Sequence, residues 1–405
     1  MKIRFGKEVI VAQSVKEKLV GGGYQDPLIR FDGERLYLKF NVRDDNSATF
    51  GQEGGNPLFV SGDGGATWKL DECEDDWIRA LKPMSNGDRL QFSEYPTLFD
   101  LPELPKAAAD RKNIATCAGH RTIYTVDELT PYLGDRIKKV FSAKRIKAGG
   151  DTPVDEVCEV RWKNMDVSYF EDYEPKFLRR YFGMQFYEHE GRLYMPLSGG
   201  FIKDDGSVGS RRACIHLLVS DDFGRSWDYL NTAVYKEEFN EPTAIDVEGF
   251  LEAALCFSGG RMAIILRSGS LSPFIIGDEN HKAPKMMICF SDDGGKTISE
   301  PKEFYDFGVF PRVISVGKRF LTCSGRPGVY IRICEDVRLE SWSEPEFILK
   351  VPDDEIYDGY FKYSCSNSDV AATGENEAVI AYSDFTKFVG GQRAKSIIVR
   401  KIYLE

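Results

Sequence analysis

Short apolar runs separated by polar, glycine-rich segments set the pattern of this chain along its whole length. Pro57–Val60, Ile215–Val219 and Met286–Phe290 are examples, and each is followed at once by Ser, Asp and Gly. Runs this short, rich in β-branched and aromatic residues and bounded by turn residues, are typical of strands rather than helices. The pattern predicts an all-β chain with many tight turns.

One of these turn segments recurs. Ser61–Trp68, Ser220–Trp227 and Ser291–Ile298 share a Ser, an Asp two residues later, a Gly two residues after that, and a hydroxyl residue before the final large side chain. Cys334–Trp342 is a worn fourth copy. The Ser and Asp side chains can bond backbone N–H groups across a turn, and Gly supplies a backbone angle that other residues resist. Each copy is therefore predicted to join two strands of a hairpin.

The repeated segments resemble the Asp boxes, or BNR repeats, of sialidases and related β-propellers. The resemblance implies a sialidase-like β-propeller of about six four-stranded blades that occupies residues 1–405 as a single domain. In that family the boxes are structural, so no catalytic role is expected for Asp63, Asp222 or Asp293. The less strand-like stretch at about 100–165 is expected to be a loop-rich insertion, either a blade with long hairpins or a lid over the pocket mouth.

Composition narrows the class of partner. The net charge of −11 disfavours binding to nucleic acid. No segment approaches the roughly 18 apolar residues of a membrane span, and no apolar run of signal-peptide length begins the chain. We therefore expect a cytoplasmic protein, or a secreted one whose signal has been trimmed.

Cysteine and histidine give no sign of a metal site. The nine cysteines are scattered and odd in number, and the four histidines lie far apart in the sequence. Buried free thiols are the expected state of the cysteines, and neither a metal ion nor an organic cofactor is expected.

The segment Phe250–Arg267 reads as strand, Gly-Gly turn and strand, with Glu252 entering the first strand and Arg267 ending the second. It resembles the sialidase segment in which a Glu precedes such a hairpin and the second arginine of a carboxylate-binding triad follows it. By that resemblance Glu252 activates a tyrosine and Arg267 binds the substrate carboxylate. A surface Glu and a strand-end Arg of an ordinary hairpin are the alternative.

A second hairpin, Phe310–Tyr330, places Arg326 between small neighbours in Ser-Gly-Arg-Pro-Gly. A guanidinium there can grip a carboxylate with two parallel hydrogen bonds. Arg326 resembles the third arginine of the triad, and Arg312 is a weaker rival for that role. A plain turn is the alternative for the Gly-Arg-Pro-Gly stretch.

Sialidase-like chains place their nucleophilic tyrosine one blade further on. Tyr363, followed by Ser364, fits this position best, and Tyr360 is the alternative. A neutral phenol suits a sugar whose anomeric carbon already bears a carboxylate, because it is not repelled as a carboxylate nucleophile would be. An ordinary packed tyrosine remains the competing interpretation.

The first blade departs from the family pattern. Gln25 occupies the position of the first triad arginine, in Tyr24-Gln25-Asp26-Pro27. Arg30 is close in sequence, but its strand parity is opposite to that of Gln25, so it is expected on the other face unless the strand bulges. With Gln25 in place of arginine, the substrate could also be an anionic sugar other than sialic acid.

The polar loop that follows the next strand offers the general acid. Asp45, Asp44 and Glu53 are its candidates, in that order, and a solvated loop is the alternative for each.

Together these residues predict a sialidase-like exo-glycosidase for a carbohydrate substrate. Tyr363 would be the nucleophile, Glu252 its base, and Arg267 and Arg326 the carboxylate clamp. Another glycosidase, a polysaccharide lyase or a non-catalytic glycan-binding propeller are the alternatives.

Overall fold

The computed structural model describes residues 2–15, 24–42, 57–71, 81–93, 97–98, 123–134, 141–167, 169–171, 177–179, 185–235, 249–268, 285–326, 328–352, 363–364 and 367–405. The chain divides into two compact units. Unit 1 comprises Met1–Lys82 together with Phe307–Glu405, and unit 2 comprises Pro83–Asp306.

Unit 1 contains two antiparallel sheets of the predicted four strands, one antiparallel sheet of five strands and a two-stranded hairpin. The first is β3 (Gln25–Phe31), β4 (Leu36–Asn41), β5 (Leu58–Ser61) and β6 (Lys69–Leu70), and the second is β24 (Val309–Val316), β25 (Arg319–Gly325), β26 (Val329–Cys334) and β27 (Glu346–Leu349). The third is β28 (Ser368–Gly374), β29 (Glu377–Asp384) and β32 (Lys395–Leu404), completed by β1 (Ile3–Phe5) and β2 (Val9–Ser14).

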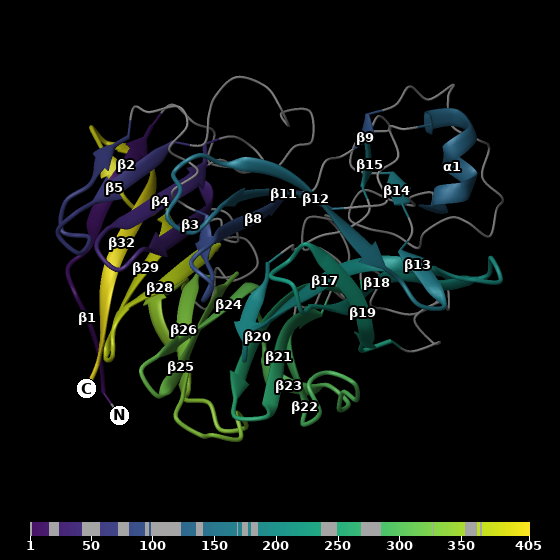
Figure 1. Ribbon diagram of the computed structural model, residues 1–405. Coiled ribbons are helices and arrows are strands. Elements are labelled where there is room, and N and C mark those ends of the chain that lie inside the picture. Colours follow the sequence, from purple (N-terminus) through teal and green to yellow (C-terminus); the bar gives the residue numbers. More distant parts are fainter. Residues whose placement is uncertain are drawn as a thin grey trace. The chain divides into compact units, whose positions relative to one another are not determined.

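Both ends of the chain build this third sheet. β1 and β2 each pair antiparallel with β32, and the termini lie together at one end of it (Figure 1). The backbone N–H of Lys2 donates to the carbonyl of Glu405 over 3.0 Å, and that of Glu405 donates back to Lys2 over 2.9 Å. The first strands are therefore held by the last one, across nearly the full length of the sequence.

Unit 2 contains one regular four-stranded sheet and one larger sheet. The regular sheet is β20 (Phe250–Ser258), β21 (Arg261–Ser268), β22 (Met286–Ser291) and β23 (Lys302–Tyr305). The larger one contains β7 (Lys82–Pro83), β8 (Arg89–Ser93), β11 (Phe141–Ile146), β12 (Val154–Arg161), β13 (Met165–Val167), β16 (Tyr187–His189), β17 (Arg192–Lys203), β18 (Val208–Ser220) and β19 (Ser226–Ala233). Within it β12 and β19 pair in parallel, which joins two strand groups that are otherwise antiparallel.

The described part of the stretch at about 100–165 contains regular secondary structure. It holds α1 (Val126–Leu133), whose N-terminus carries a capping box between Thr125 and Glu128, and the strands β11 and β12. Short strands β9 (Thr97–Leu98), β10 (Ile123–Tyr124), β14 (Tyr169–Glu171) and β15 (Phe177–Arg179) form a small sheet around it. No helix among the described residues is long and apolar enough to cross a membrane.

Strand β11 was not recognised in the sequence because one of its inward-facing residues is an arginine. Phe141, Ala143 and Arg145 are its buried alternate residues. The charge of Arg145 breaks the apolar alternation by which a half-buried strand is recognised.

The repeated turns form as predicted. In the first copy the Ser61 hydroxyl accepts from the N–H of Gly65 over 2.8 Å and donates to Asp63 over 2.8 Å. Asp63 in turn accepts from the N–H of Thr67 over 2.9 Å. The copies at Ser220 and Ser291 repeat these bonds, with the Gly224 and Gly295 N–H groups as donors.

The worn fourth copy keeps part of this network. Asp336 accepts from the N–H groups of Glu340 and Ser341, and the Trp342 indole donates to the carbonyl of Leu339 over 2.9 Å. The aspartates of the turns are thus occupied by hydrogen bonds. Those from the backbone and hydroxyl of Thr297 lower the pKa of Asp293 to about 2. Each of these aspartates therefore stabilises its turn.

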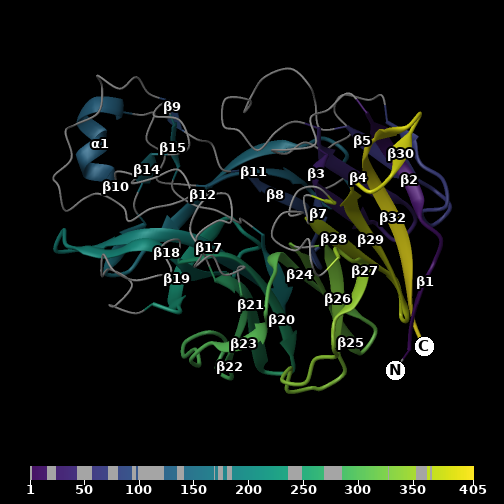
Figure 2. The same cartoon turned by 180° about the vertical axis from the view of Figure 1, so that it is seen from behind.

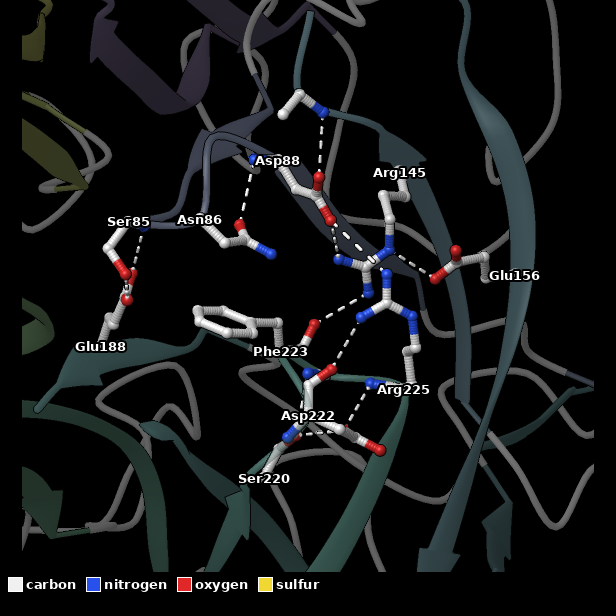
Figure 3. Close-up of polar contacts among 12 residues, drawn as sticks. Ser85, Asn86, Asp88, Arg145, Glu156, Glu188, Ser220, Asp222, Phe223 and Arg225 are labelled. Atoms are coloured by element: carbon white, nitrogen blue, oxygen red, sulfur yellow. Dashed lines mark hydrogen bonds and ion pairs between the residues drawn. The ribbon is translucent and has the colours of Figure 1, made fainter. Parts of the chain in front are cut away.

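A buried charge network links one repeated turn to the neighbouring strands of unit 2 (Figure 3). The side chain of Arg145 on β11 has 0% exposure and pairs with Asp88 over 3.0 Å and with Glu156 over 2.6 Å. It also donates to the carbonyl of Phe223, inside the turn, over 2.8 Å. Burial raises the pKa of Asp88, but hydrogen bonds from the Ala148 N–H and from Arg145 outweigh this effect and leave the pKa below its ordinary value.

The six described cysteines are free and buried, as expected: Cys158, Cys214, Cys256, Cys289, Cys323 and Cys334. Burial raises the pKa of Cys214, Cys289 and Cys323 to about 12, so these thiols stay protonated and unreactive at neutral pH. Cys73, Cys117 and Cys365 lie outside the described residues.

We expect Arg145→Met to lower the free energy of unfolding by about 3–5 kcal/mol, because it removes the buried cation of Asp88 and leaves that carboxylate only the half-exposed Arg225, 3.7 Å away. Urea unfolding of the variant measures the loss. Arg161→Met is the matched control, since Arg161 pairs with Asp228 at the surface and its removal should change stability by at most about 1 kcal/mol. Equal losses in the two variants would contradict a special role of the buried network.

We also expect the native protein to react slowly at six of its nine thiols with an aromatic disulfide reagent at pH 8. Denaturation in urea should release all nine. Rapid reaction of more than three thiols in the native state would show that the buried cysteines are accessible.

Candidate functional site

The predicted site residues occupy equivalent places in their sheets. Gln25, Glu252 and Arg312 lie near the beginning of the first strand of a sheet, on β3, β20 and β24. Arg267 and Arg326 lie where the second strand ends, on β21 and just after β25. Since first and second strands pair antiparallel, both places are at the same end of a sheet.

A bulge changes the parity of β3. Gln25 pairs with Asn41 and Leu28 with Lys39, so β3 holds one more residue than β4 over this interval. Because paired residues share a face, Gln25, Leu28 and Arg30 all lie on one face of the sheet. The sequence allowed Arg30 on the same face as Gln25 only if the strand bulges. The bulge is present, and the two residues share a face.

Asp369, a residue that sequence analysis missed, joins three strands of unit 1. Its Oδ2 accepts from the Arg30 guanidinium over 2.7 Å and from the Ile29 N–H over 2.9 Å, both on β3. Its Oδ1 forms an ion pair with Arg312 of β24 over 3.4 Å. Asp369 itself begins β28 and is buried. Two arginines predicted to bind substrate are therefore held by a carboxylate of the chain.

Two uncharged amides lie at the same end of β3 and β28. Gln25 is only 4% exposed, and its Nε2 has no hydrogen-bond partner among the described residues. Asn367 is also buried; its Nδ2 donates to Asp26, while its Oδ1 has no partner within the described part of the chain. The position of the first triad arginine is thus filled by a neutral side chain that keeps hydrogen-bonding capacity.

Lys39 is a further residue that sequence analysis passed over. It pairs with Leu28 and so lies on the face that carries Gln25 and Arg30. Burial lowers its pKa. A lysine in the middle of the apolar strand Leu36–Asn41 was the available signal.

The backbone of Arg326 is left-handed, with φ of 70°. Its N–H donates to the carbonyl of Gly328 over 3.1 Å, which closes the tight turn between β25 and β26. Tyr24, Asp26 and Phe310 also have φ of 50–54° and lie at the beginnings of β3 and β24. Non-glycine residues in this region carry backbone strain of the kind that gathers at functional sites.

Tyr363 lies just before β28, and its carbonyl accepts from the N–H of Phe385 over 2.6 Å. The Arg393 guanidinium carbon lies 5.6 Å from the centre of its ring. Tyr360 lies outside the described residues, as do Asp44, Asp45 and Glu53, so the nucleophile alternative and the acid remain predictions from the sequence.

In unit 2, the hairpin of β20 and β21 brings Glu252 and Arg267 together. Arg267 Nη1 donates to Glu252 Oε1 over 3.1 Å, and both side chains are mostly buried. The strand β20 carries a register shift between Phe250 and Ala253, which surrounds Glu252. The bulge and the ion pair fix the orientation of both charged groups.

The histidines that the structure describes are His189 and His216. Buried His216 lies between Thr232 and the carbonyl of Gly199, and burial lowers its pKa to about 4. His189 stacks on Phe257. Within the described ranges, no group of three or more His, Cys, Asp or Glu side chains is placed to hold a metal ion.

Comparisons with known proteins show the fold. No family model and no curated protein matches this sequence. A solved structure of a protein of unknown function from Dyadobacter fermentans is similar, with a TM-score of 0.60 and 17% identity over 100% of this chain and 99% of that chain. The K499G mutant of NanB sialidase from Streptococcus pneumoniae has a TM-score of 0.50 and 12% identity, over 99% of this chain and 70% of that chain. The chain is a β-propeller with a sialidase-like fold, as its repeated turns predicted.

Proposed function

We propose that this protein is a retaining exo-glycosidase that removes an anionic, sialic-acid-like terminal sugar from a glycan. The observation that carries the proposal is the Glu252–Arg267 pair, hydrogen-bonded over 3.1 Å at the ends of adjacent strands. In this pair a mostly buried carboxylate, which can take a proton, is held in a fixed position beside a guanidinium. The sialidase-like fold supports the same reaction class by analogy.

The proposed reaction has two steps. In the first, Tyr363 Oη attacks the anomeric carbon while Glu252 takes the phenolic proton, and the glycosidic C–O bond breaks. The leaving oxygen receives a proton from Asp45 or Asp44. In the second step that carboxylate takes a proton from water, the water oxygen attacks the anomeric carbon, and Tyr363 leaves and regains its proton from Glu252. Retention of configuration follows from the two displacements.

The carboxylate of the sugar is assigned to Arg267 and Arg326. Arg30 and Arg312 share the single carboxylate of Asp369, which holds both guanidiniums and balances one of their two charges. Arg326 closes a tight turn at the end of β25, which limits the conformations of its backbone. A guanidinium held in this way binds a carboxylate with less loss of conformational freedom.

A second candidate is a glycosidase for a less acidic glycan. Gln25 places an uncharged amide where a carboxylate-binding arginine was expected, and two arginines of the same unit are held by Asp369. Both features favour hydroxyl or amide groups over a carboxylate at this point. Relative activity on acidic and on neutral glycosides separates the two candidates.

We expect wild-type protein to hydrolyse a fluorogenic sialoside and Tyr363→Phe to lose at least about a thousandfold in kcat, because the nucleophilic oxygen is gone. Fluorescence release across acidic and neutral glycosides measures both. Tyr403→Phe is the control, since Tyr403 lies near the far end of β32, beside Arg4. Hydrolysis of neutral glycosides alone would favour the second candidate, and full activity of Tyr363→Phe would rule out this nucleophile.

We expect Glu252→Gln to lower kcat by about 10²–10⁴-fold, because the amide cannot take the phenolic proton. The double variant with Tyr363→Phe should lose no more than Tyr363→Phe alone, since residues that act in one step are not additive. Pre-steady-state and steady-state rates on the same sialoside measure this. Losses that multiply would show that the two residues act independently.

A further inference from the structure

A hairpin of unit 1 presents apolar side chains to solvent beside Tyr363. It consists of β30 (Phe388–Val389) and β31 (Gln392–Arg393), joined by Gly390 and Gly391. Both glycines have positive φ, which a two-residue hairpin turn of this kind requires. Phe388 is 62% exposed and Val389 is 45% exposed. An exposed aromatic at a hairpin tip contributes little to folding, and its ring surface is accessible to a ligand.

The base of the hairpin is firmly anchored. Phe385 is fully buried, and its N–H donates to the carbonyl of Tyr363 over 2.6 Å. The N–H of Ala394 donates to the carbonyl of Lys387 over 2.9 Å, and Thr386 bonds to Asp384 through both its N–H and its hydroxyl. The tip is therefore a fixed projection, at the end of β29 and β32 away from the chain termini (Figure 2).

Arg393 relates the exposed ring to Tyr363. Phe388 and Arg393 are cross-strand partners, so their side chains lie on the same face of the hairpin. The guanidinium carbon of Arg393 is 5.5 Å from the centre of the Phe388 ring and 5.6 Å from that of Tyr363. The guanidinium thus contacts both rings, and Phe388 lies on the side of the hairpin that faces Tyr363.

We propose that Phe388 is a binding platform for a sugar ring of the leaving group. The assignment rests on the proposed function, in which Tyr363 attacks the anomeric carbon of the terminal sugar. Pyranose rings have apolar C–H faces that pack on aromatic rings, and aromatic side chains line most small-molecule sites. Because the Arg393 guanidinium contacts both rings, a sugar on Phe388 is a neighbour of the sugar at Tyr363.

The chemistry of the platform favours a neutral sugar. The nearby Lys387 is paired with Glu8 and with Asp384, and Arg393 is directed toward the two rings. A terminal sugar has its glycosidic neighbour only on the leaving-group side. The platform therefore binds the second sugar of the glycan, whereas the reacting sugar binds at the site around Tyr363.

Two substrates with the same terminal sugar test this assignment. Sialyllactose carries a disaccharide leaving group, whereas sialyl fluoride carries none. We expect Phe388→Ala to lower kcat/KM for sialyllactose by about two- to tenfold, through KM, and to leave sialyl fluoride within twofold. Phe388→Trp should retain activity on both. Val337→Ala is the control, because Val337 is 73% exposed on the turn after β26 and should affect neither.

An equal effect of Phe388→Ala on the two substrates, or none on either, would overturn the platform while leaving the proposed function intact. If wild type hydrolyses neither substrate, the proposed function fails, and tryptophan emission of Phe388→Trp decides the inference separately. Titration with lactose and sialyllactose should then give a saturable change that wild type, with its five tryptophans, does not show. A flat titration would overturn the platform independently of catalysis.

Discussion

The carboxylate of Asp369 is the interaction on which the candidate site of unit 1 depends. It is buried at the beginning of β28 and bonds the backbone of β3, the guanidinium of Arg30 and that of Arg312. A buried carboxylate is tolerated only when charges and donors surround it, and here they come from two other sheets of the unit, through β3 and β24. The same contacts that stabilise Asp369 therefore fix the mutual position of β3, β24 and β28 and decide which arginines remain for a ligand.

The features that could be predicted from sequence are those closed by local contacts. The turn at Ser61 satisfies its hydrogen bonds within seven residues, from Ser61 to Thr67, so its pattern predicts its structure. The Glu252–Arg267 pair follows from one hairpin, whose register is set by a Gly-Gly turn. The propeller fold was predicted because the turn pattern of Ser61–Trp68 recurs along the chain.

The features that escaped prediction depend on contacts between distant segments. Asp369 lies more than 300 residues from Arg30, and its own surroundings in sequence, Asn-Ser-Asp-Val, are unremarkable for a strand beginning. Strand β11 was not recognised because it contains the charged Arg145. The charge is compensated by Asp88 and Glu156, which approach Arg145 only in the folded chain. The acid at Asp44 or Asp45 and the alternative nucleophile Tyr360 lie outside the described residues.

Gln25 shows how stability and binding are balanced at the end of β3. A buried amide donor costs about 1–3 kcal/mol when it has no partner, as for Gln25 Nε2 among the described residues, and the left-handed residues Tyr24 and Asp26 on either side add strain. Folding alone would favour an apolar residue and a regular strand here. An arginine would gain a ligand carboxylate, but it would add a third guanidinium to the two that already share Asp369. The amide avoids that repulsion and keeps a directed donor, so the departure of this chain from the sialidase pattern is consistent with the charges of its own unit.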